Sequence, residues 1–311
     1  MAGYNPSDIS FAITTEVTPG TTPATGVYKK LDHVPGTAPS YTSDFIESPV
    51  LSANRASAGN RKTNFRVENG LKSHLCRDDA IELLMQSAFS GVWTEAGAVG
   101  EGGDTLKASD VDTSLTIEKK VAGSPTLYSR YNGCQVSKMA LSVEASGNAE
   151  VSFDVMGMGR TTATSASALT YENASSNLKL TGRDVSSVSI AGLTGIQFRS
   201  LELSVEHSRE ARDAFGSASA VGIGTSGNRK VMLKLSFYRT DFTPEAVLVG
   251  DAPVAVSFTI GSGVDGFTFT LPAATAAVPA DAEDGSKYMV EVEFTARRDE
   301  TAGTDLMVTR L

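Results

Sequence analysis

The stretch that decides the fold occurs twice: GCQVSKMALSVE at positions 133–144 returns as GIQFRSLELSVE at positions 195–206. Six of the twelve positions are identical, among them the opening Gly, the Gln and the closing Leu-Ser-Val-Glu. In both copies apolar residues alternate with polar ones, which is the period of a strand with one buried face. A chain that uses one strand twice and carries little reactive chemistry elsewhere is typical of a structural subunit.

Each copy opens a strand hairpin. The first hairpin turns at Ser146-Gly147-Asn148, and the second is opened by a long insertion, 207–229. Alternating apolar stretches also occur at 254–260, 267–271, 290–294 and 306–308. The sequence therefore predicts a mainly β fold, a β-sandwich or open barrel, formed by a single domain over residues 1–311.

Two other segments interrupt this pattern. A helix is predicted at about 79–90, with Asp79 as N-cap, Glu82 completing a capping box and Gly91 ending it. We expect this one helix to flank the sheet. Residues 35–69 show no sustained period and predict a long loop or extended arm.

The net charge of −9 argues against a sequence-specific nucleic-acid binder, which usually needs a basic footprint. It leaves open a surface past which nucleic acid slides, because acidic walls repel phosphates. The sequence contains no long apolar run and no basic, apolar leader at its start, so we expect no membrane span and no signal peptide. We expect the protein to be made in a cytoplasm and to stay soluble there until it assembles.

Catalytic and cofactor chemistry has little support. His33, His74 and His207 share no metal-ligand spacing with Cys76 and Cys134, so no metal site, cofactor or catalytic set is predicted. The cysteines are expected to be free thiols, although a disulfide between them stays open. The glycines at 222–227 match a dinucleotide-binding pattern, but an alternating strand follows them, so a flexible Gly-rich loop is expected.

Charged residues gather in two places. The stretch 48–67 contains four basic residues and no acidic one, which makes a basic arm on an acidic protein: Arg55, Arg61, Lys62 and Arg66. Acidic residues alternate with the apolar stripes of the predicted strands: Glu144, Glu150, Asp154, Glu202, Glu206, Glu291 and Glu293. These seven carboxylates form either an ordinary solvated sheet face or the wall of a shared channel that repels a polyanionic cargo.

Five segments occur in a familiar order: Glu16 before Thr18-Pro19-Gly20-Thr21, the arm around Arg55, the helix ending near Trp93, Gly133 opening a hairpin, and VEVEFTAR at 290–297. Together they resemble the tail tube (major tail) proteins of long-tailed bacteriophages. The resemblance covers most of the chain through loose patterns. The 207–229 insertion departs from the family and is expected to form an extra inter-ring contact or an outer-surface loop.

The resemblance implies a β-sandwich with a flanking helix that assembles into hexameric rings. The rings stack into a tube, strands of neighbouring subunits join around a lumen, and DNA passes through without specific binding. It further implies contacts with tape measure, tail terminator and distal tail or baseplate proteins, and a place in the virion tail after assembly in the host bacterial cytoplasm. The basic arm is expected to contact neighbouring subunits, and the seven carboxylates to face the lumen.

Two other interpretations stay open. One is another ring- or tube-forming β protein, such as a baseplate ring or secretion-tube component. The other is a host-surface or carbohydrate-binding β-sandwich, which would favour clustered exposed aromatics on loops. The single Trp follows the helix, and no such cluster is visible.

Overall fold

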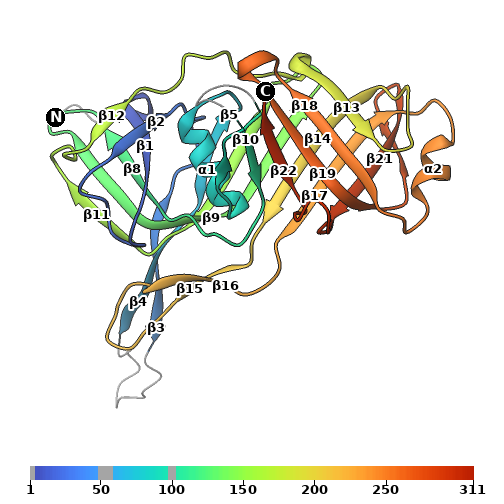
Figure 1. The fold of residues 1–311 in the computed structure, drawn as a ribbon. Helices are drawn as coiled ribbons and strands as arrows, with labels where there is room; N and C mark the ends of the chain where they lie inside the picture. Colours follow the sequence, from blue (N-terminus) through green and yellow to red (C-terminus); the bar gives the residue numbers. More distant parts are fainter. Residues whose placement is uncertain (1–3, 48–58, 97–102) are drawn as a thin grey trace.

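Strands dominate the computed structural model, which describes residues 4–47, 59–96 and 103–311 (Figure 1). The predicted mainly β class is confirmed. In the first half the strands are β1 (Ile9–Thr15), β2 (Val27–Leu31), β3 (Ser40–Glu47), β4 (Asn60–Glu68), β5 (Gly70–His74), β6 (Trp93–Thr94), β7 (Thr105–Lys107), β8 (Leu115–Val121), β9 (Leu127–Glu144), β10 (Glu150–Met156) and β11 (Gly159–Ala163). In the second half they are β12 (Thr170–Glu172), β13 (Val185–Ile190), β14 (Phe198–Glu206), β15 (Arg209–Arg212), β16 (Gly222–Thr225), β17 (Lys230–Tyr238), β18 (Val254–Ile260), β19 (Phe267–Ala276), β20 (Ala280–Asp284), β21 (Lys287–Ala296) and β22 (Met307–Arg310). The helices are α1 (Asp79–Phe89) and α2 (Thr243–Leu248).

The centre of the molecule is one antiparallel sheet, the long sheet, with strand order β5-β10-β9-β14-β17-β21-β20. Two flanking groups of strands complete the fold, β12-β2-β1-β8-β9-β11 and β13-β18-β19-β22-β7-β6. One hydrophobic cluster contains buried residues from the long sheet, both flanking groups and both helices. Burial of this shared core is the main favourable contribution to the stability of the fold.

The two copies of the repeated sequence lie side by side in the long sheet. β9 and β14 are antiparallel neighbours, and Leu141 lies directly opposite Leu203. Both leucines are fully buried, while the polar residues between the apolar positions point away from the core. The predicted hairpins are confirmed as β9–β10 and β14–β17.

The helix predicted at 79–90 is confirmed as α1, but its predicted cap is wrong by one residue. Asp78 is the N-cap: its backbone is extended, and its carboxylate accepts a hydrogen bond from the Ala80 amide at 2.8 Å. Glu82 does not complete a capping box. Its buried side chain forms ion pairs with Arg77 at 2.5 Å and with Arg310.

The expectation of a single flanking helix is also wrong, because α2 is a second one. It has only six residues, begins with Thr243-Pro244 and buries Pro244 and Leu248. So short a segment shows less than two turns of periodicity, which is too little for the sequence pattern to reveal.

The two segments expected to be loops contain β-hairpins. β3 pairs with β4 inside the 35–69 arm, and β15 pairs with β16 inside the 207–229 insertion. The glycines expected to form a flexible loop therefore lie partly in a strand, since β16 is Gly222–Thr225. Figure 1 shows both hairpins leaving the body on the same side.

The chain repeats its architecture. Apart from the short strands β6, β7, β11, β12 and β22, the first unit has the order β1, β2, hairpin β3–β4, β5, α1, β8, β9, β10, and the second unit has the order β13, β14, hairpin β15–β16, β17, α2, β18, β19 with β20, β21. In each unit a strand, a helix and a long β-meander follow the hairpin. Two units with eight elements in the same order indicate an internal duplication of one fold.

Strand registers support this correspondence. β8 pairs with β9 in the first unit, and β18 pairs with β19 in the second. In both pairs the register shifts directly after the first residue of the first strand, which is Leu115 in β8 and Val254 in β18. β9 is 18 residues long, and β19 begins at Phe267 while β20 ends at Asp284, an equal length of chain. Beta irregularities at matching positions are features of a fold rather than accidents of sequence.

Candidate assembly surfaces

All seven carboxylates predicted for a channel wall lie on one face of the long sheet. Each is exposed or half-buried, and each alternates with buried residues on the same strand. Cross-strand pairing extends this face from β10 to β21: Ser142 lies opposite both Glu150 and Glu202, and Glu202 lies opposite Lys234, which pairs on its other side with Glu293. The structure therefore brings the predicted residues together on one surface.

This surface, the charged face, is not uniformly acidic. Lys138 lies between Asp154 and Glu206 in register, and Lys230 lies on the far side of Glu206. Lys72 Nζ lies 2.6 Å from a Glu150 oxygen, and Lys234 Nζ lies 2.7 Å from a Glu291 oxygen. The hydrogen bond to Glu291 raises the pKa of Lys234. Opposite charges on neighbouring strands stabilise the pairing and leave a weak excess of negative charge on the charged face.

The basic arm differs from its prediction in two ways. Arg55 lies outside the described residues. Arg66 is neutralised within its own hairpin, because its guanidinium contacts Asp44 at 2.8 Å and Glu68 at 2.6 Å. These ion pairs lower the pKa of Asp44 and raise that of Arg66. Among the described residues, Arg61 and Lys62 are the predicted contact residues that remain exposed.

The two hairpins form one composite arm. Backbone hydrogen bonds join them, since the Phe65 amide donates to Ala218 at 2.9 Å and the Ala220 amide donates to Phe65 at 3.1 Å. Tyr41 stacks on Phe65, and its hydroxyl lies 3.2 Å from the Ser219 hydroxyl. The insertion therefore braces the first hairpin near its base, and both hairpins project together from the body (Figure 1).

Exposed apolar side chains lie on the composite arm. Phe45 and Ile46 on β3 are each 60% exposed, and Phe215 in the β15–β16 connection is fully exposed. Lys62 lies over the Phe45 ring, and Arg61 lies opposite Ile46. A projecting surface that pairs apolar groups with free cations is typical of a protein–protein contact.

A buried arginine anchors the second hairpin to the body. The Arg209 side chain has no solvent exposure and donates to the Val136 carbonyl at 2.8 Å, to the Gln135 side chain at 2.5 Å, to Ser90 at 3.0 Å and to Asp112 at 2.9 Å. His207, two residues earlier, lies 2.7 Å from the Ala88 carbonyl, and burial lowers its pKa. The arm is therefore fixed to β9 and to the end of α1.

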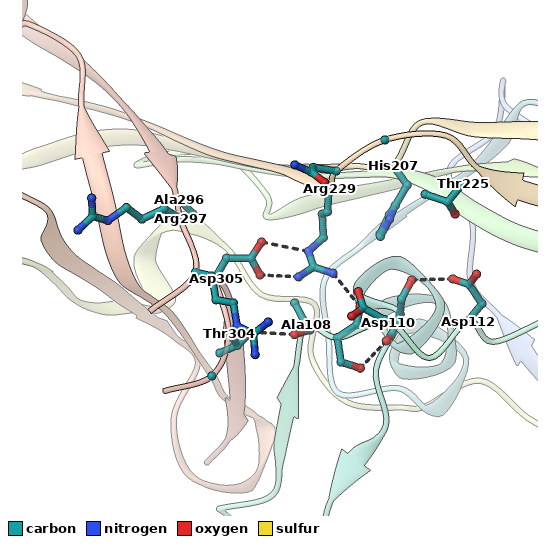
Figure 2. A pocket seen from close by; sticks show the side chains of 16 residues that line it. Ala108, Asp110, Asp112, His207, Thr225, Arg229, Ala296, Arg297, Thr304 and Asp305 are labelled. Carbon is teal, nitrogen blue, oxygen red and sulfur yellow. Dashed lines mark hydrogen bonds and ion pairs between the residues drawn. The ribbon is translucent and has the colours of Figure 1, made fainter. Parts of the chain in front are cut away.

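A polar cavity of about 630 Å³ lies beside this root (Figure 2). Arg229 spans it and forms a two-point ion pair with Asp305, at 2.6 and 3.2 Å, and donates to the Ser109 carbonyl at 2.9 Å. Thr304 donates to the Ala108 carbonyl at 2.9 Å. These paired groups link the root of the arm to the C-terminal segment.

The Glu16 motif that carried the resemblance has a structural role. The Glu16 carboxylate accepts hydrogen bonds from the Gly20 amide at 2.7 Å, the Thr116 hydroxyl at 2.6 Å and the Gly133 amide at 3.0 Å. Gly133 has φ +66, and a Cβ there would lie 2.6 Å from Met158. Two segments far apart in sequence are thus held together by one carboxylate and one glycine.

Reactive groups do not converge in the described residues. Cys76 and Cys134 are free and buried, as expected, and burial raises both thiol pKa values. Within the described ranges no group of three or more His, Cys, Asp or Glu side chains has a metal-binding arrangement. None of the described helices combines the length and the apolar character needed to cross a membrane.

A duplicated β fold with a charged sheet face and a projecting arm defines a structural protein built for assembly. Comparison with protein families agrees: residues 6–296 match the phage tail tube protein family, and the chain belongs to that family. It is a structural subunit of a phage tail tube. No curated protein matches the chain.

Proposed function

We propose that copies of this chain join into closed rings that stack into a hollow tube, with the charged face toward the lumen. Six chains around each ring is the number expected from the resemblance. The observation that carries the proposal is the charged face, on which seven carboxylates from four strands, β9, β10, β14 and β21, share one side of a continuous sheet. The opposite side of that sheet is packed into the core, so only the charged face is free to border a channel.

The charge pattern suits a passage for DNA. Carboxylates repel the phosphate backbone, while the interspersed lysines Lys72, Lys138, Lys230 and Lys234 are each paired with or opposite an acidic residue. A wall of this kind offers no continuous row of free cations for phosphates to bind. We propose that DNA slides past the charged face without specific contacts.

The composite arm supplies the contact between successive rings in this proposal. Phe45 and Ile46 bury apolar area against the next ring, and Arg61 and Lys62 pair with acidic groups there. Arg66 stabilises its own hairpin and does not contact a neighbouring subunit in this proposal, because its guanidinium already forms ion pairs with Asp44 and Glu68. Arg55 stays a predicted contact residue.

The family also indicates partners and location. We propose a non-enzymatic role without a cofactor, in the virion tail, following assembly in the host bacterial cytoplasm. Contacts with tape measure, tail terminator and distal tail or baseplate proteins belong to the same proposal.

Electron microscopy of the purified chain at rising concentration tests ring and tube formation. We expect rings at low concentration and hollow tubes at high concentration. A monomer that persists across the whole range would contradict the proposal.

The lumen assignment has a separate test. Glu202→Lys with Glu206→Lys places two cations on the charged face, and we expect the assembled tubes to retain duplex DNA in a co-sedimentation assay. Asp251→Lys with Glu300→Lys changes the charge equally at exposed positions outside the charged face and the composite arm and serves as the matched control. Equal DNA retention by both double variants would place the charged face outside the lumen.

A further inference from the structure

The long sheet has an open edge at each end. At one end, β20 pairs only with β21 among the described residues. At the other end, the segment 32–39 forms no strand and contacts β5 at its start: the Val34 amide donates to the Lys72 carbonyl at 2.7 Å, and the Ser73 hydroxyl donates to the Asp32 carbonyl at 2.6 Å. Open strand edges invite pairing with another chain unless they are covered.

Within one chain, strands that correspond to these two open edges already pair with each other. β9, the last strand of the long sheet in the first unit, pairs with β14, the first such strand in the second unit. The pairing runs antiparallel from Glu144 opposite Ser200 to Lys138 opposite Glu206. This internal junction joins one unit to the next within a single continuous sheet.

The open edges correspond to the two halves of that junction. β20 pairs with β21 in the second unit, and the end of β9 pairs with β10 in the first unit, so β20 corresponds to the end of β9. Asp284 is the last residue of β20, and Glu144 is the last residue of β9. The 32–39 segment precedes the first hairpin and contacts β5 through Val34, as β14 precedes the second hairpin and pairs with β17.

Registers place individual residues in this correspondence. β5 and β17 end at His74 and Tyr238, and in each case the helix begins five residues later, so Lys72 corresponds to Ser236. Val34 donates to Lys72, and Ser200 lies opposite Ser236. Val34 therefore corresponds to Ser200, just as Asp284 corresponds to Glu144.

We infer that β20 of one chain pairs with residues 34–38 of a second copy, where the turn at Pro35-Gly36 opens on pairing, and so reproduces the β9–β14 junction between chains. The contact is head-to-tail, so it propagates until the ring closes. Each chain supplies two units, and a ring of six units takes three chains. This inference rests on the proposed ring-forming function and replaces six chains per ring with three.

The chemistry of the two edges fits this pairing. In a hairpin with a two-residue loop, alternate amides point away from the partner strand, which leaves those of Asp281 and Glu283 directed outward from β20. Asp281, Glu283 and Asp284 are exposed. The two lysines near the other edge already have acidic partners, since Lys72 Nζ lies 2.6 Å from Glu150 and Lys179 Nζ lies 3.0 Å from Asp32. Backbone groups therefore carry the inferred contact: its register places the outward amides of Glu283 and Asp281 opposite Pro35 and Thr37, whose carbonyls accept them.

Cysteine cross-linking in the full chain tests both the junction and the count. Val34→Cys with Asp284→Cys places thiols at positions that pair in the inferred contact, and mild oxidation of assembled rings is expected to give a covalent ladder that ends at three chains. Glu144→Cys with Ser200→Cys is the matched control, because it bridges the internal junction and gives no ladder. The native cysteines are buried, which keeps the background low.

The outcomes separate the inference from the proposed function. Rings seen by microscopy with a ladder that ends at six chains, or with no ladder, overturn the inference and leave the tail tube assembly standing. A failure to form rings under any condition removes the proposed assembly and the inference with it.

A backbone test complements the cross-link. Glu283→Pro removes an outward amide from β20, whereas Glu283→Ala removes only the charge at the same position. We expect ring formation to be lost in the proline variant and retained in the alanine variant, with both folded by circular dichroism. Normal rings from a folded Glu283→Pro chain would overturn the inference.

Discussion

The two units share an order of elements but differ in how the chain crosses from the flanking strands into the long sheet. In the first unit, β9 makes this crossing as one strand of 18 residues. In the second unit, the equivalent stretch is broken between β19 and β20 at residues 277–279, where Pro279 is buried. Proline has no amide to donate to a neighbouring strand, so the strand is interrupted at Pro279 and β20 is a separate short strand.

The helices of the two units differ in length and in the number of buried residues. α1 spans 11 residues and buries eight of them, whereas α2 spans six and buries two. The first unit therefore holds the larger share of packing, and the second ends in an open, acidic edge strand. One fold has thus been used twice, once as the packed centre and once as a joining end.

Core truncations at equivalent positions should measure this difference, and they carry the largest expected effect. Phe153 lies opposite Leu71 in the first unit, and Val292 lies opposite Leu235 in the second. Phe153→Ala is expected to lower the free energy of unfolding by about 4 kcal/mol and Val292→Ala by about 2 kcal/mol, because the larger side chain leaves the larger cavity. Urea denaturation followed by circular dichroism measures both; equal losses would show that the units are packed alike.

The anchoring of the β15–β16 hairpin by Arg209 gives the second prediction. Arg209→Met removes a fully buried guanidinium and leaves Gln135 and the backbone acceptor at Val136 without their donor. We expect a loss of about 3 kcal/mol in the free energy of unfolding, measured by urea denaturation. Arg212→Met lies in the same hairpin on an exposed side chain and is expected to change stability by less than about 0.5 kcal/mol. Comparable losses in the two variants would mean that Arg209 does not anchor the arm.

The same root should respond to pH. Burial lowers the pKa of His207 below its usual value, so the unfolded chain binds a proton at a higher pH than the folded chain does. The contribution of His207 is therefore complete above about pH 6.5 and is lost as the pH falls below it. Thermal unfolding at pH 7.5 and pH 5.5 should show a smaller difference for His207→Gln than for the natural chain.

His33 provides the comparison for that measurement. Its pKa is also lowered by burial, and it lies against the Phe11 ring at a centroid distance of 4.8 Å, away from the arm. His33→Gln should leave the pH dependence that comes from His207 in place. If the His207 variant keeps the full pH dependence of the natural chain, the arm root is not the acid-sensitive site.

Parts of the fold followed directly from the sequence because a single physical pattern determined them. Alternation predicted β9–β10 and β14–β17, since one face of each strand is buried. The charged face followed from the same alternation. α1 was located by its periodicity, and its N-cap was misplaced because Asp78 and Asp79 are adjacent and chemically equivalent.

Other parts left no such pattern. β3 lies on a projecting hairpin with no fully buried residue, so its sequence needs no apolar stripe. The sequence does not reveal the duplication either, because equivalent residues of the two units, such as Phe153 and Val292, share only an apolar side chain at a buried position. The partners of Arg66 come from β3 and from the end of β4, and only the register of the hairpin brings Asp44 beside it.

The smallest effect on folding is expected for the exposed cations of the composite arm, Arg61 and Lys62, whose substitution should affect tube assembly rather than stability. Arg61→Glu with Lys62→Glu reverses two exposed charges and is expected to change the free energy of unfolding by less than about 0.5 kcal/mol, while shortening tubes seen by electron microscopy. Arg66→Ala is the matched variant, because it removes two ion pairs within the hairpin and should cost up to about 1 kcal/mol while tubes still form. Unchanged tube length and yield in the double variant would remove Arg61 and Lys62 from the contact between rings, and would leave Phe45 and Ile46 as the part of the arm that a neighbour must cover.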